Sequence, residues 1–261
     1  MNMKAIVEKM NEDRFTTSEI GSIQVRELCM PPLEERSEIA KRFSWHVPMV
    51  GIVFGSFNPP HLGHMNLIEA AKKICDFVCI VPAAHNPMKE KAPVSMIDRY
   101  MMLKNMYGET SRSGAWIDSR TWISFHEMYM SECEKGPVYT DESLKFLTKK
   151  LLPSTSKICV VIVTTDETFR EMHNWHNGEE ILKTWPMIIF SFSDKSGFKV
   201  KEMFDPAERM APIGTPFRVF AEIPYMNMHS TQIREMISKG EDPLGFAPGV
   251  FAYAKEKGLY K

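Results

Sequence analysis

Ten residues, GSFNPPHLGH at positions 55–64, have types and spacing that suit the binding of phosphate. An apolar stretch at positions 49–54 runs directly into them and an apolar-periodic stretch follows, which predicts a strand, a tight turn and the start of a helix. Gly55 lets the backbone approach a ligand closely, and Ser56 offers a hydroxyl and an amide. His61 and His64, three residues apart at the head of the helix, can face one anion held at its N-terminus. These residues therefore predict a phosphate site.

A second candidate group lies near the other end of the chain, in NMHSTQIREMISKG at positions 227–240. Thr231 is a predicted helix N-cap, and Arg234 would project from the first turn toward an anion at that N-terminus. Taken alone, this pattern is more typical of a capped helix with a solvated arginine. Together with the first motif, it predicts a second set of phosphate contacts.

Metal binding is the main alternative for the two histidines. A zinc site would need further ligands near His61 and His64, and the neighbouring sequence supplies none. The five cysteines show no two pairs with metal-ligand spacing, and their odd number fits reduced thiols. Cys75 and Cys79, the only close pair, are expected at a helix end and inside the next strand, so they should not share a face. No protein metal site is predicted.

The composition narrows the class of ligand. A chain of 261 residues with 44% hydrophobic content can bury a substantial core. With 32 basic and 33 acidic side chains, no field of one sign draws it to nucleic acid or an anionic membrane, so phosphate binding must be local. The N-terminal stretch has no apolar h-region, and the longest apolar runs are too short to cross a bilayer. We expect a cytoplasmic protein, or a nuclear one in a eukaryote, with small-molecule ligands and an oligomeric state left open, a homo-oligomer included.

Strand and helix patterns alternate along the rest of the chain. Strands are predicted at Val50–Phe54, Phe77–Pro82, Ala115–Asp118, Lys157–Thr164, Met187–Phe192 and Phe217–Ile223, and helices at Leu62–Ile74, Val94–Tyr107, Asp141–Lys150, Thr231–Lys239 and Pro248–Lys257. Such alternation predicts an α/β fold, a Rossmann-like doubly wound parallel sheet with helices on both faces. Ligands of such sheets bind outside the carboxyl ends of the strands at the switch point, where the first motif begins. Residues 1–48 lie outside this pattern and are expected to form an N-terminal extension of unassigned role, before a single domain at 49–261.

The first motif resembles the GxFxPxHxGH signature of the nucleotidylyltransferase superfamily, and every motif position is filled. Positions 228–234 resemble the second signature of that superfamily, ISSTxxR, except that His229 occupies the first Ser position. The tail PLGFAPGVFAYAKEKGLY resembles that of the nicotinamide and nicotinate mononucleotide adenylyltransferases, as do AHNPMKEKAPVSMIDRYMML, WIDSRTW and VYTDESL. Pantetheine-phosphate adenylyltransferases and glycerol-phosphate cytidylyltransferases share only the two phosphate motifs. The resemblance covers Val50 to the C-terminus and is closest to the mononucleotide enzymes.

This resemblance implies an adenylyltransferase of NAD biosynthesis. The 5′-phosphate of the mononucleotide would attack the α-phosphorus of ATP, release pyrophosphate and form NAD or deamido-NAD. His61, His64 and Arg234 are the implied catalytic residues, with Mg²⁺ carried by the ATP phosphates rather than by a carboxylate cage. The implied ATP site comprises Gly55, Ser56, Phe57, His61, His64, Asp166, Asn227, Ser230, Thr231 and Arg234.

The same resemblance assigns Ser56 and Lys89 to the phosphate of the mononucleotide, with Lys91 as an alternative to Lys89. The pyridine ring needs a flat apolar partner. The candidates around it are Trp122, Tyr129, Tyr139 with Thr140, and Trp175. Trp175 is the preferred candidate, because it lies in a polar loop after the strand ICVVIV, where related enzymes also place an aromatic residue. Since ring stacking hardly distinguishes an amide from a carboxylate, both mononucleotides are expected as substrates.

Two features leave alternatives open. Where relatives have Gly-x-Asp, this chain has Thr164-Thr165-Asp166, so Thr164 could crowd the adenosine ribose. Asp166 fits contact with the ribose, or else is a buried helix N-cap. A protein that senses NAD or a mononucleotide on the same fold is the alternative to an enzyme. The intact His61, His64 and Arg234 favour the enzyme, because a sensor has no need of groups that hold an attacked triphosphate.

Overall fold

The computed structural model describes residues 49–84, 94–107, 117–118, 120–124, 126–127, 130–131, 137–151, 159–193, 199–201, 218–224, 229–241, 245–246 and 249–261. The proposed N-terminal extension at 1–48 lies outside these residues, and so do Lys89, Lys91, Tyr129 and Asn227.

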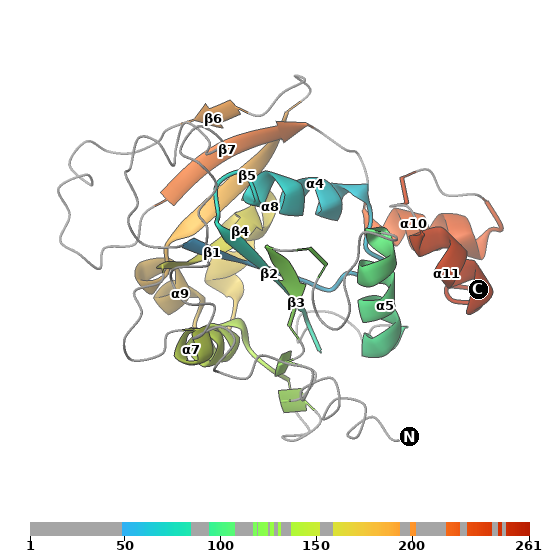
Figure 1. Cartoon of the computed structure of the whole chain (residues 1–261), viewed down its shortest axis with the longest axis horizontal. Coiled ribbons are helices and arrows are strands. Elements are labelled where there is room, and N and C mark those ends of the chain that lie inside the picture. Colours follow the sequence, from blue (N-terminus) through green and yellow to red (C-terminus); the bar gives the residue numbers. More distant parts are fainter. Residues whose placement is uncertain are drawn as a thin grey trace.

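A seven-stranded sheet forms the centre of the described part of the chain (Figure 1). Its strand order is β3-β2-β1-β4-β5-β7-β6. Every pairing is parallel except that of the edge strand β6 with β7, which is antiparallel. The strands are β1 (Met49–Gly55), β2 (Phe77–Pro82), β3 (Thr121–Ile123), β4 (Cys159–Thr165), β5 (Met187–Ser193), β6 (Lys199–Lys201) and β7 (Arg218–Pro224).

Helices cover both faces of this sheet (Figure 1). They are α4 (Leu62–Ala71), α5 (Met96–Met106), α7 (Thr140–Leu151), α8 (Asp166–Glu171), η3 (Met172–Asn174), α9 (Gly178–Thr184), α10 (Ser230–Ser238) and α11 (Val250–Glu256). The apolar side chains of α4, α5 and α11 join one core cluster, and those of α7, η3 and α9 join the clusters on the opposite face. The predicted doubly wound α/β fold is therefore confirmed. Among the described residues, no helix combines the length and the apolar character that a bilayer crossing requires.

The central strands are apolar on both faces because both faces are covered. Along β4, Val161 and Val163 point into the cluster with α4, while Ile162 points into the cluster with α7 and α9. Full burial of such a side chain contributes about 1.5–3 kcal/mol to stability. Cys75 and Cys79 are buried in different clusters, as predicted, and both are free thiols.

Three details differ from the sequence predictions. The strand predicted at Ala115–Asp118 is wrong for its described residues, because Ile117 and Asp118 form a bend whose N–H groups donate to the Thr121 carbonyl, and β3 begins only at Thr121. The short helices α8 and α9, of 6 and 7 residues, were not predicted, since neither is long enough to display a helical period clearly. The antiparallel edge strand β6 was also missed.

Candidate active site

The candidate site lies where the order of the sheet reverses. Strand β1 is followed by α4 and then by β2 on one side, whereas β4 is followed by β5 on the other side. The two strands are direct neighbours, with Val53 paired to Val163. The first motif leaves the carboxyl end of β1 and α8 leaves that of β4, so both begin at the predicted switch point.

His61 and His64 form a close pair at the start of α4. His61 is the N-cap residue, and its Nδ1 accepts a hydrogen bond from the Gly63 N–H at 3.1 Å. His64 Nδ1 accepts from the His61 N–H at 3.2 Å, and the two ring centroids are 3.8 Å apart. A ring nitrogen that accepts carries no proton, so in each neutral imidazole the proton is on Nε2. The two adjacent rings therefore each keep an Nε2–H as a donor when they are neutral.

The electrostatic environment keeps one of these rings neutral. His61 is 8% exposed, and burial, together with the nearby His229, lowers its pKa to about 4. At neutral pH this imidazole is a hydrogen-bond donor without a charge. Arg234, whose guanidinium stays protonated, brings a positive charge to the implied catalytic set.

Two glycines of the motif make room for aromatic rings. A Cβ at Gly55 would lie 2.9 Å from the ring of Phe57, and a Cβ at Gly63 would lie 2.9 Å from the ring of His61. Phe57 itself is 1% exposed, so its side chain belongs to the core, and the predicted contact with ATP would have to come from its backbone. Gly55 thus has a packing role in addition to the close backbone approach expected from the sequence.

The second motif reaches across to the first. The Ser230 hydroxyl donates to the Pro59 carbonyl at 2.9 Å, and Arg234 Nη1 donates to the Asn58 carbonyl at 2.7 Å. Arg234 Nη2 also donates to the Thr231 hydroxyl at 3.0 Å. The fold therefore brings the two predicted phosphate motifs together, although about 170 residues separate them.

The predicted N-cap at Thr231 is wrong. The N-cap of α10 is His229, whose N–H donates to the Gln232 side chain at 3.1 Å, and Ser230 is the first helical residue. Thr231 lies one position inside the helix, where its hydroxyl can hold Arg234. The departure at His229 from the family signature therefore falls on the cap position.

Tyr260, near the C-terminus, also contacts the turn of the first motif. Tyr260 donates its hydroxyl to Asn58 Oδ1 at 2.7 Å, while Arg234 is bonded to the carbonyl of the same asparagine. Asn58 is 6% exposed. The sequence resemblance included Tyr260 without a role, and no local pattern could reveal a contact between residues 202 positions apart.

The end of β4 has its own polar arrangement. Thr165 is the N-cap of α8, and Asp166 is the first helical residue. The Asp166 side chain is 29% exposed and pairs with Arg170 at 2.9 Å. Asp166 is therefore neither buried nor the N-cap, and its carboxylate lies at the carboxyl edge of the sheet. Thr164 is 5% exposed and, by alternation along β4, shares the face of Ile162.

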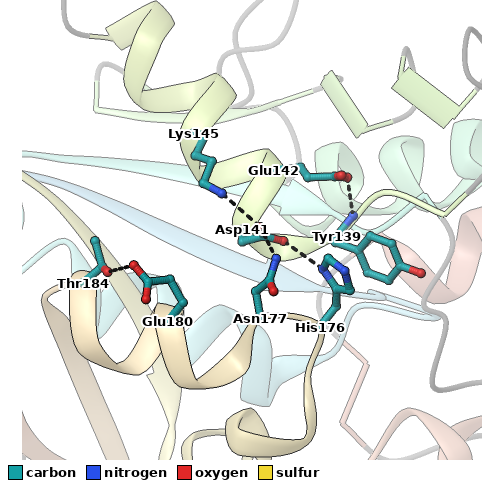
Figure 2. A network of polar contacts seen from close by, with 8 residues as sticks. All are labelled: Tyr139, Asp141, Glu142, Lys145, His176, Asn177, Glu180 and Thr184. Atoms are coloured by element: carbon teal, nitrogen blue, oxygen red, sulfur yellow. Dashed lines mark hydrogen bonds and ion pairs between the residues drawn. The ribbon is translucent and has the colours of Figure 1, made fainter.

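A second polar group joins the start of α7 to the loop that follows α8 (Figure 2). The Tyr139 ring stacks on the His176 ring with centroids 4.0 Å apart. The buried carboxylate of Asp141 is bonded to His176 Nδ1 at 3.3 Å and to Asn177 Nδ2 at 2.9 Å. These contacts bring Thr140, the first residue of α7, and the partly buried Trp175 to one region, as their candidate roles require.

Trp122 is a core residue. It lies in β3, is 4% exposed, and packs with apolar side chains of β1, β2, β4 and α7. This burial favours a core role over that of a platform for the pyridine, so Trp175 stays the preferred candidate. The sequence leaves both roles open because a tryptophan in a short strand gives the same pattern whether it faces the core or a ligand.

Comparison with known proteins gives a consistent result. The sequence model of the cytidylyltransferase-like family matches residues 52–236. A probable nicotinate-nucleotide adenylyltransferase of Chlorobium phaeobacteroides is 26% identical over 216 residues, covering 79% of this chain and 96% of the relative. One of Lactiplantibacillus plantarum is 28% identical over 217 residues, covering 81% and 88%. The structure of Plasmodium falciparum nicotinic acid mononucleotide adenylyltransferase complexed with NaAD has a TM-score of 0.59 at 16% identity, covering 82% of this chain and 97% of that one, which shows a shared fold.

Proposed function

We propose that this chain, which belongs to the cytidylyltransferase-like family, is a nucleotidyltransferase that joins nicotinate or nicotinamide mononucleotide to the AMP moiety of ATP. The products are deamido-NAD or NAD, and pyrophosphate. The observation that carries this proposal is the meeting of the two motifs, in which Arg234 is bonded to the turn that carries His61 and His64. The two relatives named above are probable nicotinate-nucleotide adenylyltransferases, which supports nicotinate mononucleotide as the first substrate to test.

The reaction asks the protein to hold two polyanions head to head. An oxygen of the 5′-phosphate attacks the α-phosphorus of ATP in line, the bond to the bridging oxygen of the β-phosphate breaks, and pyrophosphate leaves with that electron pair. No covalent enzyme intermediate is needed. Well-oriented reactants account for roughly 7–11 kcal/mol of the barrier in such reactions.

The side chains of the two motifs supply donors for the ATP phosphates. His61 and His64 offer Nε2–H groups from one turn, without a net charge on His61. A guanidinium has five N–H donors, and the bonds of Arg234 to Asn58 and Thr231 fix its plane while leaving others for phosphate oxygens. We assign to these three side chains the stabilisation of the negative charge that develops on the leaving pyrophosphate.

Magnesium fits this site as part of the substrate, MgATP. The donors gathered at the first turn are N–H groups, which bind phosphate oxygens and cannot ligate a cation. Across the described residues, no group of three or more His, Cys, Asp and Glu side chains is arranged to hold a metal ion. Phosphate oxygens and water would therefore be the ligands of Mg²⁺.

For the mononucleotide, we assign Ser56 and Lys89 to the phosphate, and Thr140 and Trp175 to the ring end of the site. Ser56 directly follows β1, and Thr140 begins α7 beside the loop of Trp175. Asp166, at the carboxyl end of β4, is assigned to the adenosine ribose.

Replacement of Trp175 by alanine should separate the two substrates. Stacking on the pyridine contributes roughly 0.5–1.5 kcal/mol, so KM for the mononucleotide is expected to rise about tenfold while KM for ATP stays nearly unchanged. Trp175→Phe, which keeps an aromatic ring, should recover most of the loss. Phe251→Ala, which removes a ring from α11, is the control and should not separate the two KM values. An equal rise in both KM values would make Trp175 a structural residue.

The function itself is tested by offering each mononucleotide with MgATP and measuring dinucleotide and pyrophosphate. We expect equal amounts of the two products, and a difference in kcat/KM between the mononucleotides smaller than about a thousandfold, since stacking hardly reads the ring substituent. Binding of a mononucleotide or of NAD without any pyrophosphate would instead identify a sensor on the same fold.

A further inference from the structure

A carboxylate and a guanidinium that the proposed reaction does not use are buried beside the first motif. Glu127 is 3% exposed and follows β3, and Arg99 is 2% exposed and lies on α5. Charged side chains are rarely buried this deeply unless they form hydrogen bonds or ion pairs. The hydrogen-bond partners of these two residues therefore indicate their role.

Arg99 binds the backbone at the ends of two neighbouring strands. Its Nη1 donates to the Ser56 carbonyl at 2.7 Å and to the Ala83 carbonyl at 2.8 Å. Its Nη2 donates to the Ala84 carbonyl at 3.4 Å. Ser56 follows β1 and Ala83 follows β2, so this one side chain holds the backbone just after the carboxyl ends of both strands. These two segments flank the proposed phosphate end of the mononucleotide site.

Glu127 holds the same backbone from the other side and connects it to a helix. Its Oε2 accepts from the Ala84 N–H at 3.1 Å, and its Oε1 accepts from the Ser143 hydroxyl at 2.7 Å. Ala84 is thus held at its N–H by the carboxylate and at its carbonyl by the guanidinium. Ser143 lies in the first turns of α7, which begins at Thr140 at the proposed ring end of the site.

Stability alone is a weak explanation for this pair. Burial raises the pKa of Glu127 to about 7, even though the hydrogen bonds from Ser143 and Ala84 and the charge of Arg99 favour the carboxylate. Even buried charges in direct ion-pair contact can often be replaced by apolar residues without loss of stability. A pair that instead binds the backbone after β1 and β2 and links it to the Ser143 hydroxyl of α7 has a geometric effect that apolar residues could not reproduce.

We propose that Arg99 and Glu127 are positioning residues for the mononucleotide. They fix the backbone of Ser56 and Ala84, which holds the phosphate end, at a set distance from α7, which holds the ring end. This inference rests on the proposed function of the site and adds the device that sets the spacing of its two ends.

Ser143→Ala is the most selective test, because it removes the link to α7 and leaves the bond between Glu127 and Ala84. We expect KM for the mononucleotide to rise about tenfold, the effect of losing one hydrogen bond to a charged group, with KM for ATP within about twofold of wild type. Thr184→Ala is the matched control, since it removes a hydroxyl that donates to Glu180 at the end of α9 (Figure 2) and should change neither KM.

Substitutions of Glu127 and Arg99 separate geometry from charge. Glu127→Ala leaves both donors without an acceptor and should raise KM for the mononucleotide by at least about tenfold. Glu127→Gln should restore KM to within about threefold, because the amide oxygen can accept from Ala84 and the amide nitrogen can donate to the Ser143 hydroxyl. Arg99→Lys keeps the charge, but a compact ammonium cannot reproduce the two separate nitrogens of the guanidinium fork that bind the three carbonyls, so it should behave like Glu127→Ala.

The melting temperature of each variant and calorimetric binding of the mononucleotide complete the test. A fall in melting temperature with an unchanged ratio of the two KM values in Ser143→Ala and Glu127→Ala would overturn the proposal and leave a structural pair. If Glu127→Ala does not fold, Ser143→Ala decides the outcome. Absence of any dinucleotide with the wild-type protein would reject the proposed function instead, so the two failures are distinguishable.

Discussion

Substitution of His64 by alanine is expected to lower kcat for dinucleotide formation about 10²-fold or more, with little change in fold. The reason is that the His64 ring lies beside the His61 ring in the turn, where its Nε2–H would donate to phosphate oxygens whose charge grows as pyrophosphate leaves. Loss of one preorganised donor of this kind typically costs a factor of this size. Steady-state kcat and the melting temperature measure the two effects separately.

Two further variants divide the roles of the two ring nitrogens. His64 Nδ1 accepts from the His61 N–H, and the oxygen of an asparagine can take that place. His64→Asn should therefore keep the turn intact and still lose kcat like the alanine variant. His64→Gln, whose amide N–H reaches the position of Nε2–H, should recover part of kcat. A folded His64→Asn enzyme with wild-type kcat would falsify the assignment.

The first motif could be predicted from the sequence because its signals are local. The continuous apolar run indicates a strand, the Pro-rich segment a turn, and the two histidines three residues apart the first turn of a helix. None of these signals depends on a distant contact. The same holds for the parallel sheet, since apolar segments such as VVIV at positions 160–163, buried on both faces, need helices between them. The boundaries of β2 were predicted without error for this reason.

The parts that could not be predicted depend on distant contacts. Arg99 lies in a stretch that resembles the family, but the sequence does not identify its partners, and only the fold brings it to Ser56, 43 residues away. Tyr260 and Asn58 are joined in the same way. Trp122 was ambiguous because three residues of β3 have no period that could identify the buried face. The sequence favours Thr231 as the cap of α10 because Thr is a common N-cap, whereas the cap is His229, two residues earlier, with Gln232 at the third helical position completing a capping box.

Replacement of Arg234 is expected to have an effect as large as that of His64. The guanidinium is the positively charged group of the second motif, and its bonds to the Asn58 carbonyl and the Thr231 hydroxyl aim it at the turn of the first. Arg234→Ala should reduce kcat about 10²-fold or more. Stability should change little, because the Asn58 side chain keeps its bond to Tyr260 and Ser230 still binds Pro59.

Arg234→Lys distinguishes geometry from charge at this position. An ammonium keeps the positive charge but cannot bind Asn58, Thr231 and a phosphate at once in one plane, so kcat should stay well below that of wild type. Lys183→Ala serves as the control, since Lys183 pairs with Glu179 at an exposed position on α9 and its loss should leave the kinetics unchanged. Wild-type ATP kinetics in Arg234→Ala and Arg234→Lys would identify Arg234 as a solvated side chain of a capped helix. Full activity in Arg234→Lys alone would show that charge at this place is sufficient, and that the bonds to Asn58 and Thr231 hold the turn together without aiming the donor.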